Sequence, residues 1–310
     1  MKILKFLLFT SPLLLFIIVA SVRDLNEGKL GTRSNPIKIY FTPSVDAKRI
    51  TTNARDLINF LEDKTGYYFV SAVPASFVAV VEAFGTKKAD IAGLNTFSYL
   101  MANAKYGVQA KLRIVRNGGE TSYRGQFITR IDSGIDSLKD IEGRSMAYVD
   151  PSSTSGYILP KAKLDAMGIH PSETVFAMRH DNVVTMVYQG QAAAGATYYS
   201  PPDSATGEIL DARMRVEKQF PDVAQKVKII GFTEPIPNDP WVFRKDLPEE
   251  MKNKVIKALM EYVKTPAGKK AMFDIYDIVG LIPTKDSDYD PLRKLLKKQH
   301  ISFETLVKKK

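Results

Sequence analysis

Residues 145–157 have the sequence SMAYVDPSSTSGY, in which a short β-strand pattern leads directly into the start of a helix. The mostly apolar residues 145–149 predict a buried strand. Hydroxyl residues then lie where a helix over residues 154–167 begins, and Gly168 is positioned to end that helix. A strand followed at once by a helix is the unit from which α/β sheets are built.

The same unit occurs on both sides of this stretch. Before it, we expect strands at residues 37–41, 67–73, 89–94, 112–115 and 125–130, with helices beginning near Ala47, Ser76 and Phe97. After it, we expect strands at residues 174–176, 193–198 and 228–232, a helix at 181–189, and three amphipathic helices from Pro248 onward. This alternation predicts an α/β fold with largely parallel sheet.

The pattern stops and restarts once, which predicts two lobes. We expect lobe 1 to contain residues 36–125 and 238–310, and lobe 2 to contain residues 130–235. The chain would cross between them near residues 125–132 and again near 232–240. A cleft between lobes is a preferred place for a ligand, and lobes joined in this way commonly close around it.

The amino terminus has the pattern of an export signal. Lys2 and Lys5 precede an apolar run from Phe6 to Val22, so we expect residues 1–22 to be a signal peptide and residues 23–35 a linker. The small residues near Ala20 form an imperfect cleavage site, which leaves an uncleaved anchor open. No comparable apolar run follows, so we expect a soluble, periplasmic or otherwise extracytoplasmic protein.

Composition narrows the chemistry. The chain has no cysteine, which excludes disulfides, thiolate metal sites and the lipid-modified cysteine of a lipoprotein. With three histidines as well, we expect no metal site and no cofactor. The net charge of +10 favours an anionic partner. The basic residues form no stripe interleaved with aromatic residues, so we expect no nucleic-acid binding.

The segment from Asp150 to Gly156 predicts an anion site. The first N–H groups of a helix lack intrahelical partners, and the helix dipole adds partial positive charge there. Hydroxyls of Ser153, Thr154 and Ser155 would add donors, and Gly156 would let the backbone approach closely. Simple capping of the helix by one hydroxyl is the alternative. The position after the carboxyl end of a strand favours a ligand site.

Catalysis is the weaker interpretation. Ser153 or Ser155 with His180 and Asp181 would supply the nucleophile, base and orienting group of a hydrolase. However, side chains adjacent in sequence point in different directions. The sequence also lacks the nucleophile-elbow, Walker, dinucleotide-binding and zinc-protease motifs. We therefore expect a binding protein rather than an enzyme.

The sequence resembles the substrate-binding components of phosphate/phosphite/phosphonate ABC transporters over roughly residues 36–300. The resemblance is carried by the order and spacing of residues 89–92, 97–99, 122–127, 132–135, 150–157, 180–181, 190–196 and 235–239. It implies a two-lobed periplasmic binding protein fold of type II, a small phosphorus oxyanion as ligand, and an ABC permease in the membrane as partner. We expect a monomer. A ligand-sensing partner of a membrane sensor with the same fold stays open.

The resemblance also implies roles for individual residues. Ser153, Thr154 and Ser155 would bind the phosphoryl oxygens, and His180 would donate to the same oxyanion from lobe 2. Tyr99 would reach the ligand from the opposite wall. The family often has a further polar or aromatic residue just after the first strand, for which the candidates are Tyr40, Thr42 and Ser44.

One departure from the family pattern is Ala193, which stands where an aspartate is usual. That aspartate accepts a hydrogen bond from a protonated ligand oxygen or a ligand amine. We therefore expect an altered ligand choice that favours a fully deprotonated oxyanion or an ester without a P–OH, and a strong preference for an aminoalkylphosphonate would contradict this. Asp181 and Asp239 stay open as substitutes for the missing aspartate. We expect Arg124 to brace the hinge rather than bind the anion. We expect Tyr157, Tyr198 and Tyr199 to pack in the core, with lining of the cleft as the alternative, and Trp241 to serve in packing.

Overall fold

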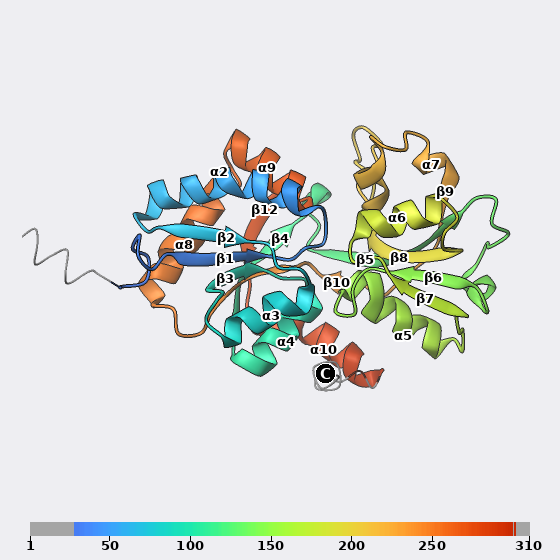
Figure 1. Cartoon of the computed structure of the whole chain (residues 1–310), viewed down its shortest axis with the longest axis horizontal. Coiled ribbons are helices and arrows are strands. Elements are labelled where there is room, and N and C mark those ends of the chain that lie inside the picture. The colour runs from blue at the N-terminus through green and yellow to red at the C-terminus, as the bar shows by residue number, and fades with distance from the viewer. Residues whose placement is uncertain (1–27, 300, 302–310) are drawn as a thin grey trace, which may run out of the picture.

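The computed structural model describes residues 28–299 and 301 of the chain. Within these residues the chain forms two α/β lobes, each built on its own sheet (Figure 1). The two-lobed fold predicted from the sequence is confirmed. The predicted signal peptide and the first residues of the predicted linker lie outside the described residues. In the described part, no helix has the length and hydropathy needed to span a bilayer.

The first lobe contains a mixed sheet with strand order β12-β4-β11-β3-β1-β2. Its strands are β1 (Ile37–Phe41), β2 (Phe69–Ala72), β3 (Ile91–Gly93), β4 (Gln109–Val115), β11 (Pro240–Phe243) and β12 (Gly280–Pro283). β1 pairs in parallel with β2 and β3, so the carboxyl ends of all three strands meet at one edge. That edge faces the second lobe (Figure 1).

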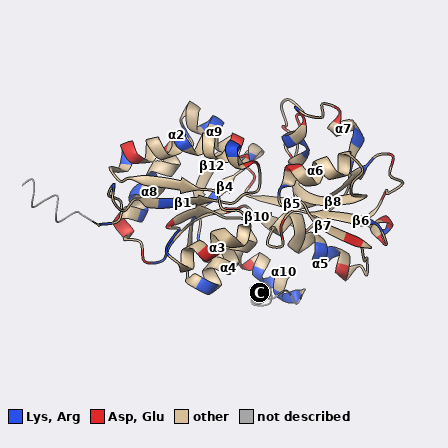
Figure 2. Cartoon of the chain, in the orientation of Figure 1, with Lys and Arg blue, Asp and Glu red and all other residues tan. Residues whose placement is uncertain are grey.

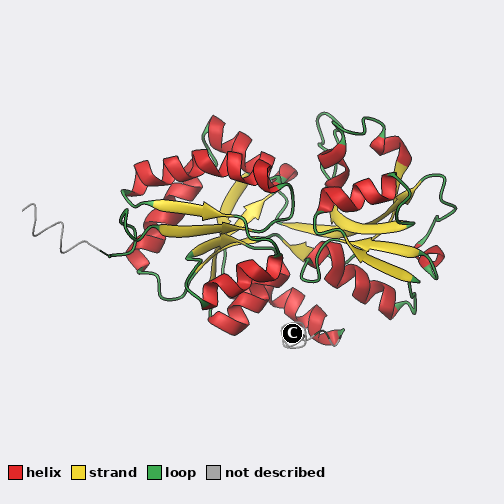
Figure 3. Cartoon of the chain, viewed as in Figure 1, coloured by secondary structure: helices red, strands yellow, loops and turns green. Residues whose placement is uncertain are grey.

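Helices cover both faces of this sheet (Figure 3). On one face lie α2 (Ala47–Thr65), α8 (Glu249–Tyr262) and α9 (Pro266–Tyr276); on the other lie α3 (Phe77–Gly85), α4 (Thr96–Tyr106) and α10 (Asp290–Lys298). The long α2 forms as the sequence predicts. Its residues Ile50, Leu57 and Leu61 are buried at helical spacing, and Gly66 ends it with a φ of 73°.

The second lobe has a sheet with strand order β10-β5-β8-β6-β7, and β9 also pairs with β5. Its strands are β5 (Ser122–Arg130), β6 (Ser145–Tyr148), β7 (Glu173–Phe176), β8 (Ala194–Tyr199), β9 (Val227–Phe232) and β10 (Ile236–Pro237). One face packs against α5 (Leu159–Ala166). The other packs against α6 (His180–Tyr188), α7 (Val223–Lys226) and the 3₁₀ turn η4 (Ala212–Val216). Acidic and basic residues are interspersed over both lobes (Figure 2).

The chain crosses between the lobes earlier than the sequence predicted. β4 ends at Val115 in the first sheet, and β5 begins at Ser122 in the second. β5 pairs with β10 from its first residues and with β8 and β9 along its length, so the whole strand belongs to the second lobe. The chain returns between β10 and β11, at residues 238–239. The first crossover is therefore residues 116–121 rather than the neighbourhood of residues 125–132.

A continuous set of buried side chains joins the lobes. It includes Phe97 and Leu100 of the first lobe, Val149 and Val183 of the second, and Leu292 of α10. Separate clusters fill the outer faces, beneath α2, α8 and α9 in the first lobe and beneath α5 in the second. The lobes are thus packed against each other, and the edges that carry the strand ends face each other.

Candidate functional site

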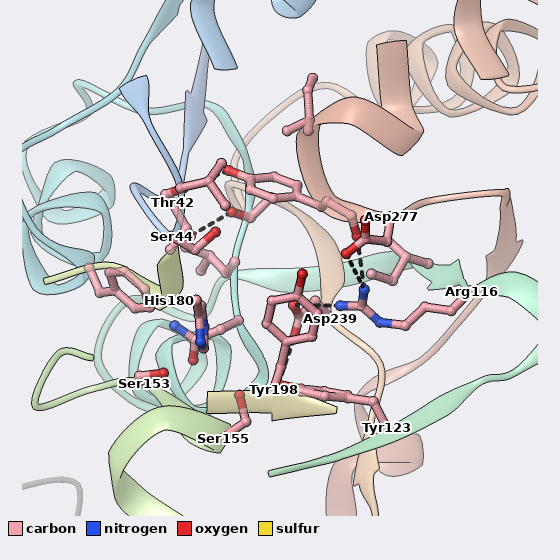
Figure 4. A pocket seen from close by; sticks show the side chains of 18 of the residues that line it. Thr42, Ser44, Arg116, Tyr123, Ser153, Ser155, His180, Tyr198, Asp239 and Asp277 are labelled. Carbon is pink, nitrogen blue, oxygen red and sulfur yellow. Dashed lines mark hydrogen bonds and ion pairs between the residues drawn. The ribbon is translucent and has the colours of Figure 1, made fainter. Parts of the chain in front are cut away.

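A cavity of about 50 Å³ lies between the lobes at the carboxyl ends of their strands (Figure 4). A water-sized group needs roughly 10–15 Å³, so the cavity holds on the order of four such groups. Its polar and aromatic lining residues are Thr42, Ser44, Phe77, Asn95, Arg116, Tyr123, Ser153, Ser155, His180, Tyr198, Arg215, Asp239, Trp241, Tyr276 and Asp277. A small ion matches this space; a nucleotide or a sugar does not.

Helix starts converge on the cavity from both lobes. Asn95 caps α4 after β3, Ser153 caps the helical segment after β6, and α6 begins at His180 after β7. All three residues line the cavity. The first three N–H groups of α4 are already taken, by Asp239, Thr154 and Asn95. The positive ends of the helix dipoles still point toward the cavity and favour an anion there.

The predicted segment after β6 begins with a π-helical turn, Thr154–Ile158, which continues into α5. Ser153 caps it by accepting a hydrogen bond from the N–H of Gly156 at 3.1 Å. Ser153 and Ser155 reach the cavity, whereas Gly156 packs behind it. A Cβ on Gly156 would lie 2.4 Å from Cγ2 of Val149, so the turn requires glycine here. Two of the three predicted hydroxyls are therefore placed at the cavity.

Thr154 has a different environment. Its Oγ1 accepts a hydrogen bond from the N–H of Phe97 at 2.9 Å and donates to Oδ1 of Asn95 at 3.0 Å. Both partners belong to the first lobe. The hydroxyl predicted to contact the oxyanion thus joins the two lobes beside the cavity, and Thr154 does not line it.

His180 presents a neutral imidazole to the cavity. Its Nδ1 lies 2.7 Å from Oγ1 of Thr197, and its ring packs edge-on against Tyr198. Burial, with smaller contributions from Arg215 and Arg116, lowers its pKa to about 3. Among the described residues, Nε2 has no hydrogen-bond partner. With Thr197 donating to Nδ1, Nε2 would carry the proton and could donate it to a ligand.

A charged wall completes the cavity. Arg215 of the second lobe pairs with Asp277 of the first at 2.7 Å, and Arg116 lies 3.6 Å from Asp277 and 3.9 Å from Asp239. Asp239 also accepts hydrogen bonds from the N–H and hydroxyl of Thr96, at 3.2 Å each. Its side chain is 26% exposed and lines the cavity. Burial raises its pKa, against the opposing effect of Arg116.

Tyr99 and Tyr40 lie outside the cavity lining. Tyr99 is buried in α4, where its hydroxyl donates to Asp286 and its ring packs edge-on against Tyr289. Tyr40 packs against the apolar cluster that includes α3 and α4. Of the candidates after β1, Thr42 and Ser44 reach the cavity instead.

Ala193 does not occupy a ligand position. It lies at the amino end of β8, where its N–H donates to Oγ of Ser145 at 3.0 Å. Tyr198, at the other end of the strand, lines the cavity. Five residues of strand separate them by roughly 16 Å, at about 3.3 Å per residue. The hypothesis that Ala193 removes an acceptor from the ligand therefore does not hold; Asp239 and Asp277 supply carboxylates at the cavity.

The other open residues are resolved by their contacts. Arg124 donates to the carbonyl of Thr233 at 2.9 Å, a contact within the second lobe, so its predicted bracing of the hinge stays a prediction. Asp181 pairs with Arg179, outside the cavity lining. Tyr198 and Trp241, expected mainly to pack in the core, are buried and also line the cavity.

Sequence reasoning missed Arg116, Arg215, Tyr276 and Asp277. Arg116 follows the carboxyl end of β4, so its position after a strand was an available signal. Arg215 lies in a short 3₁₀ turn and Asp277 in a left-handed helix cap, where sequence patterns carry little information. No cluster of three or more potential metal ligands occurs among the described residues.

Comparisons with known proteins agree with this geometry. A family model described as "ABC transporter, phosphonate, periplasmic substrate-binding protein" matches residues 39–289. The phosphonates-binding periplasmic protein of Escherichia coli K12 is 24% identical over 305 residues, which cover 95% of this chain and 84% of the relative. A phosphate-import protein of Mycolicibacterium smegmatis is 27% identical over 175 residues, which cover 52% of this chain and 54% of the relative.

Solved structures show the same fold. A binding protein component of an ABC phosphonate transporter from Pseudomonas aeruginosa superposes with a TM-score of 0.74 at 21% identity, covering 85% of this chain and 86% of the other. A protein from Prochlorococcus marinus in complex with methylphosphonate gives a TM-score of 0.72 at 16% identity, covering 86% and 98%. With the family match spanning most of its length, this chain belongs to the family of periplasmic substrate-binding proteins of phosphonate ABC transporters.

Proposed function

We propose that this protein captures a small phosphorus oxyanion, either a phosphonate, phosphite or phosphate, between its lobes and delivers it to an ABC permease. The observation that carries the proposal is the convergence of helix starts, hydroxyls and a neutral histidine on one small cavity. The ligands named for the relatives support the same class of compound.

Hydrogen-bond donors surround the space for the oxyanion. Ser153 offers its hydroxyl, Ser155 offers its hydroxyl and its backbone N–H in the first turn, and His180 offers Nε2–H from α6. The N–H of Ser153 already donates to the carbonyl of Asp150 at 2.9 Å. Ser44 lines the cavity from the first lobe. Hydrogen bonds to an ionised acceptor are about twice as strong as neutral ones, so donors held in place by folding give affinity without a net charge.

The carboxylates of the cavity are balanced by arginines. Arg116 and Arg215 offset Asp239 and Asp277, and His180 is neutral. The helix starts therefore supply the excess positive potential. Asp239, with its raised pKa, would accept a hydrogen bond from a protonated ligand oxygen.

Calorimetric titration with methylphosphonate, phosphite, phosphate and sulfate tests the proposal. We expect saturable binding of at least one phosphorus oxyanion and a matching rise in melting temperature, because a ligand that binds only the folded state stabilises it. The proposal fails if the folded protein binds none of the three phosphorus compounds.

A further inference from the structure

The guanidinium of Arg116 occupies a cage built for a cation. It lies 5.2 Å from the ring centroid of Tyr123 and 5.7 Å from that of Tyr198. Asp277 and Asp239 lie on its other sides, at 3.6 and 3.9 Å. Figure 4 shows this group on the far side of Tyr198 from His180 and Ser153, to which the proposed function assigns the oxyanion.

Carboxylates and aromatic faces are the groups with which proteins recognise ammonium ligands. Here the guanidinium of Arg116 takes the position that the ammonium group of a ligand would otherwise occupy. Arg116 is held in place because its Nη1 also donates to the carbonyl of Tyr276 at 2.9 Å, and the residue is only 6% exposed. Asp277 is paired a second time, with Arg215 at 2.7 Å. A cationic group on a ligand would find both carboxylates already paired.

We propose that Arg116 determines the substrate class, by excluding phosphorus oxyanions with a cationic substituent and admitting those whose substituent is absent or uncharged. This inference rests on the proposed function. A ligand ammonium entering the far end of the cavity would lie beside two guanidinium groups in a site from which water is largely excluded. Repulsion between like charges is strong in such a site. An apolar substituent meets no such repulsion, and Trp241 and the tyrosines offer it apolar surface.

Ethylphosphonate and aminomethylphosphonate provide a matched pair of probes, because they differ only in a methyl group against an ammonium group. Calorimetric titration of the wild-type protein at neutral pH should show ethylphosphonate binding about tenfold or more tightly than aminomethylphosphonate. In Arg116→Met, which keeps an apolar side chain but removes the charge, this preference should fall by about tenfold or more. Asp239 then has no arginine beside it and can pair with the ligand ammonium.

Arg144→Met is the control, because Arg144 is exposed and lies outside the cavity, and it should keep the wild-type preference. Equal binding of the two probes by the wild type, or an unchanged preference in Arg116→Met, overturns the inference. If Arg116→Met does not fold, Arg116→Gln replaces it. The comparison of the two probes on the wild-type protein tests the inference in either case.

The same titrations distinguish failure of the proposed function from failure of this inference. A wild-type protein that binds neither the two probes nor phosphate, phosphite or methylphosphonate sinks both proposals. If the wild type binds phosphate but neither probe, the titration of Arg116→Met with the two probes tests the inference. Arg116→Met must then bind aminomethylphosphonate more tightly than ethylphosphonate, and absence of that gain overturns the inference alone.

Discussion

Ser155 lines the cavity in the first turn of a helical segment, and we propose that its hydroxyl and its backbone N–H bind the oxyanion. Ser155→Ala removes only the hydroxyl. Hydrogen bonds to charged groups contribute about 1.5–3 kcal/mol, so we expect the affinity for the oxyanion to fall roughly 10- to 150-fold. Calorimetric titration measures this loss. Ser204→Ala, at an exposed position outside the cavity, should bind like the wild type; equal affinity of the Ser155 variant would remove Ser155 from the site.

The buried His180 gives a prediction about pH and stability. Its pKa is about 3 in the folded protein against about 6.5 when unfolded, so between these values the unfolded chain binds the extra proton. The stability from this residue is therefore fully present above pH 6.5 and is lost as the pH falls toward 3, by up to about 1.4 kcal/mol per pH unit. Urea unfolding across this window should show a shallower fall in His180→Gln. Parallel curves for the two proteins would contradict the buried neutral state.

At the scale of residues, the sequence predicted the side of the cavity that Ser153, Ser155 and His180 line better than the side that Arg116 and Arg215 line. Ser153, Ser155 and His180 follow strands directly, so local order placed them at the strand ends. Arg116 and Arg215 come from distant parts of the chain to pair with Asp277. Local sequence patterns do not predict ion pairs between residues so far apart in the chain. Thr154 was predicted as a ligand contact because composition does not show which lobe a hydroxyl faces.

The helical segment after β6 illustrates how an element shapes the site. Its π-turn holds Gly156 against Val149, with no room for a Cβ. Gly156→Ala should therefore shift the turn, displace Ser155 and weaken binding, and also lower the melting temperature by several degrees, as a strained core substitution does. Thermal unfolding and calorimetry measure the two effects.

Gly280→Ala is the control for that prediction. Its added Cβ would lie 3.5 Å from Cβ of Val115, an ordinary contact, and the position has no left-handed backbone. We expect nearly unchanged stability and binding. If Gly156→Ala behaves in the same way, the segment after β6 is more adaptable than its packing indicates.

At the scale of elements, the sequence predicted the strand–helix units but not the returning strands. Helices α8, α9 and α10 match the amphipathic patterns after Pro248. β11 and β12 were missed because both are short and insert antiparallel into a sheet whose other strands come from far earlier in the chain. Pro240, which disfavours a central strand, is tolerated because it is the first residue of β11.

For the molecule as a whole, the ion pair between Arg215 and Asp277 links lobe 2 to lobe 1. Arg215 also donates to the carbonyl of Asp274 at 3.1 Å, again across the lobes. Arg215→Met should shift the protein toward an open arrangement of the lobes. We expect a larger radius of gyration in small-angle X-ray scattering and weaker ligand binding, because part of the binding free energy must then close the lobes.

Arg213→Met provides the matched comparison. Arg213 lies in the same 3₁₀ turn, but its partner Asp211 is in the same lobe, at 2.8 Å. This variant loses the same charge and should keep the wild-type radius of gyration, even if its stability falls. A similar expansion in both variants would show that loss of charge, rather than loss of the contact between lobes, is responsible.

The hydrogen bonds of Thr154 to Phe97 and Asn95 have a consequence for the kinetics of release. They are made by the protein alone, beside the cavity. If an oxyanion binds in the cavity as proposed, these bonds would have to break as the lobes open, and we expect that opening to limit the escape rate of any oxyanion. Compounds of different affinity should share a similar residence time and differ mainly in how fast they are captured, and Thr154→Val should shorten that residence time for all of them alike.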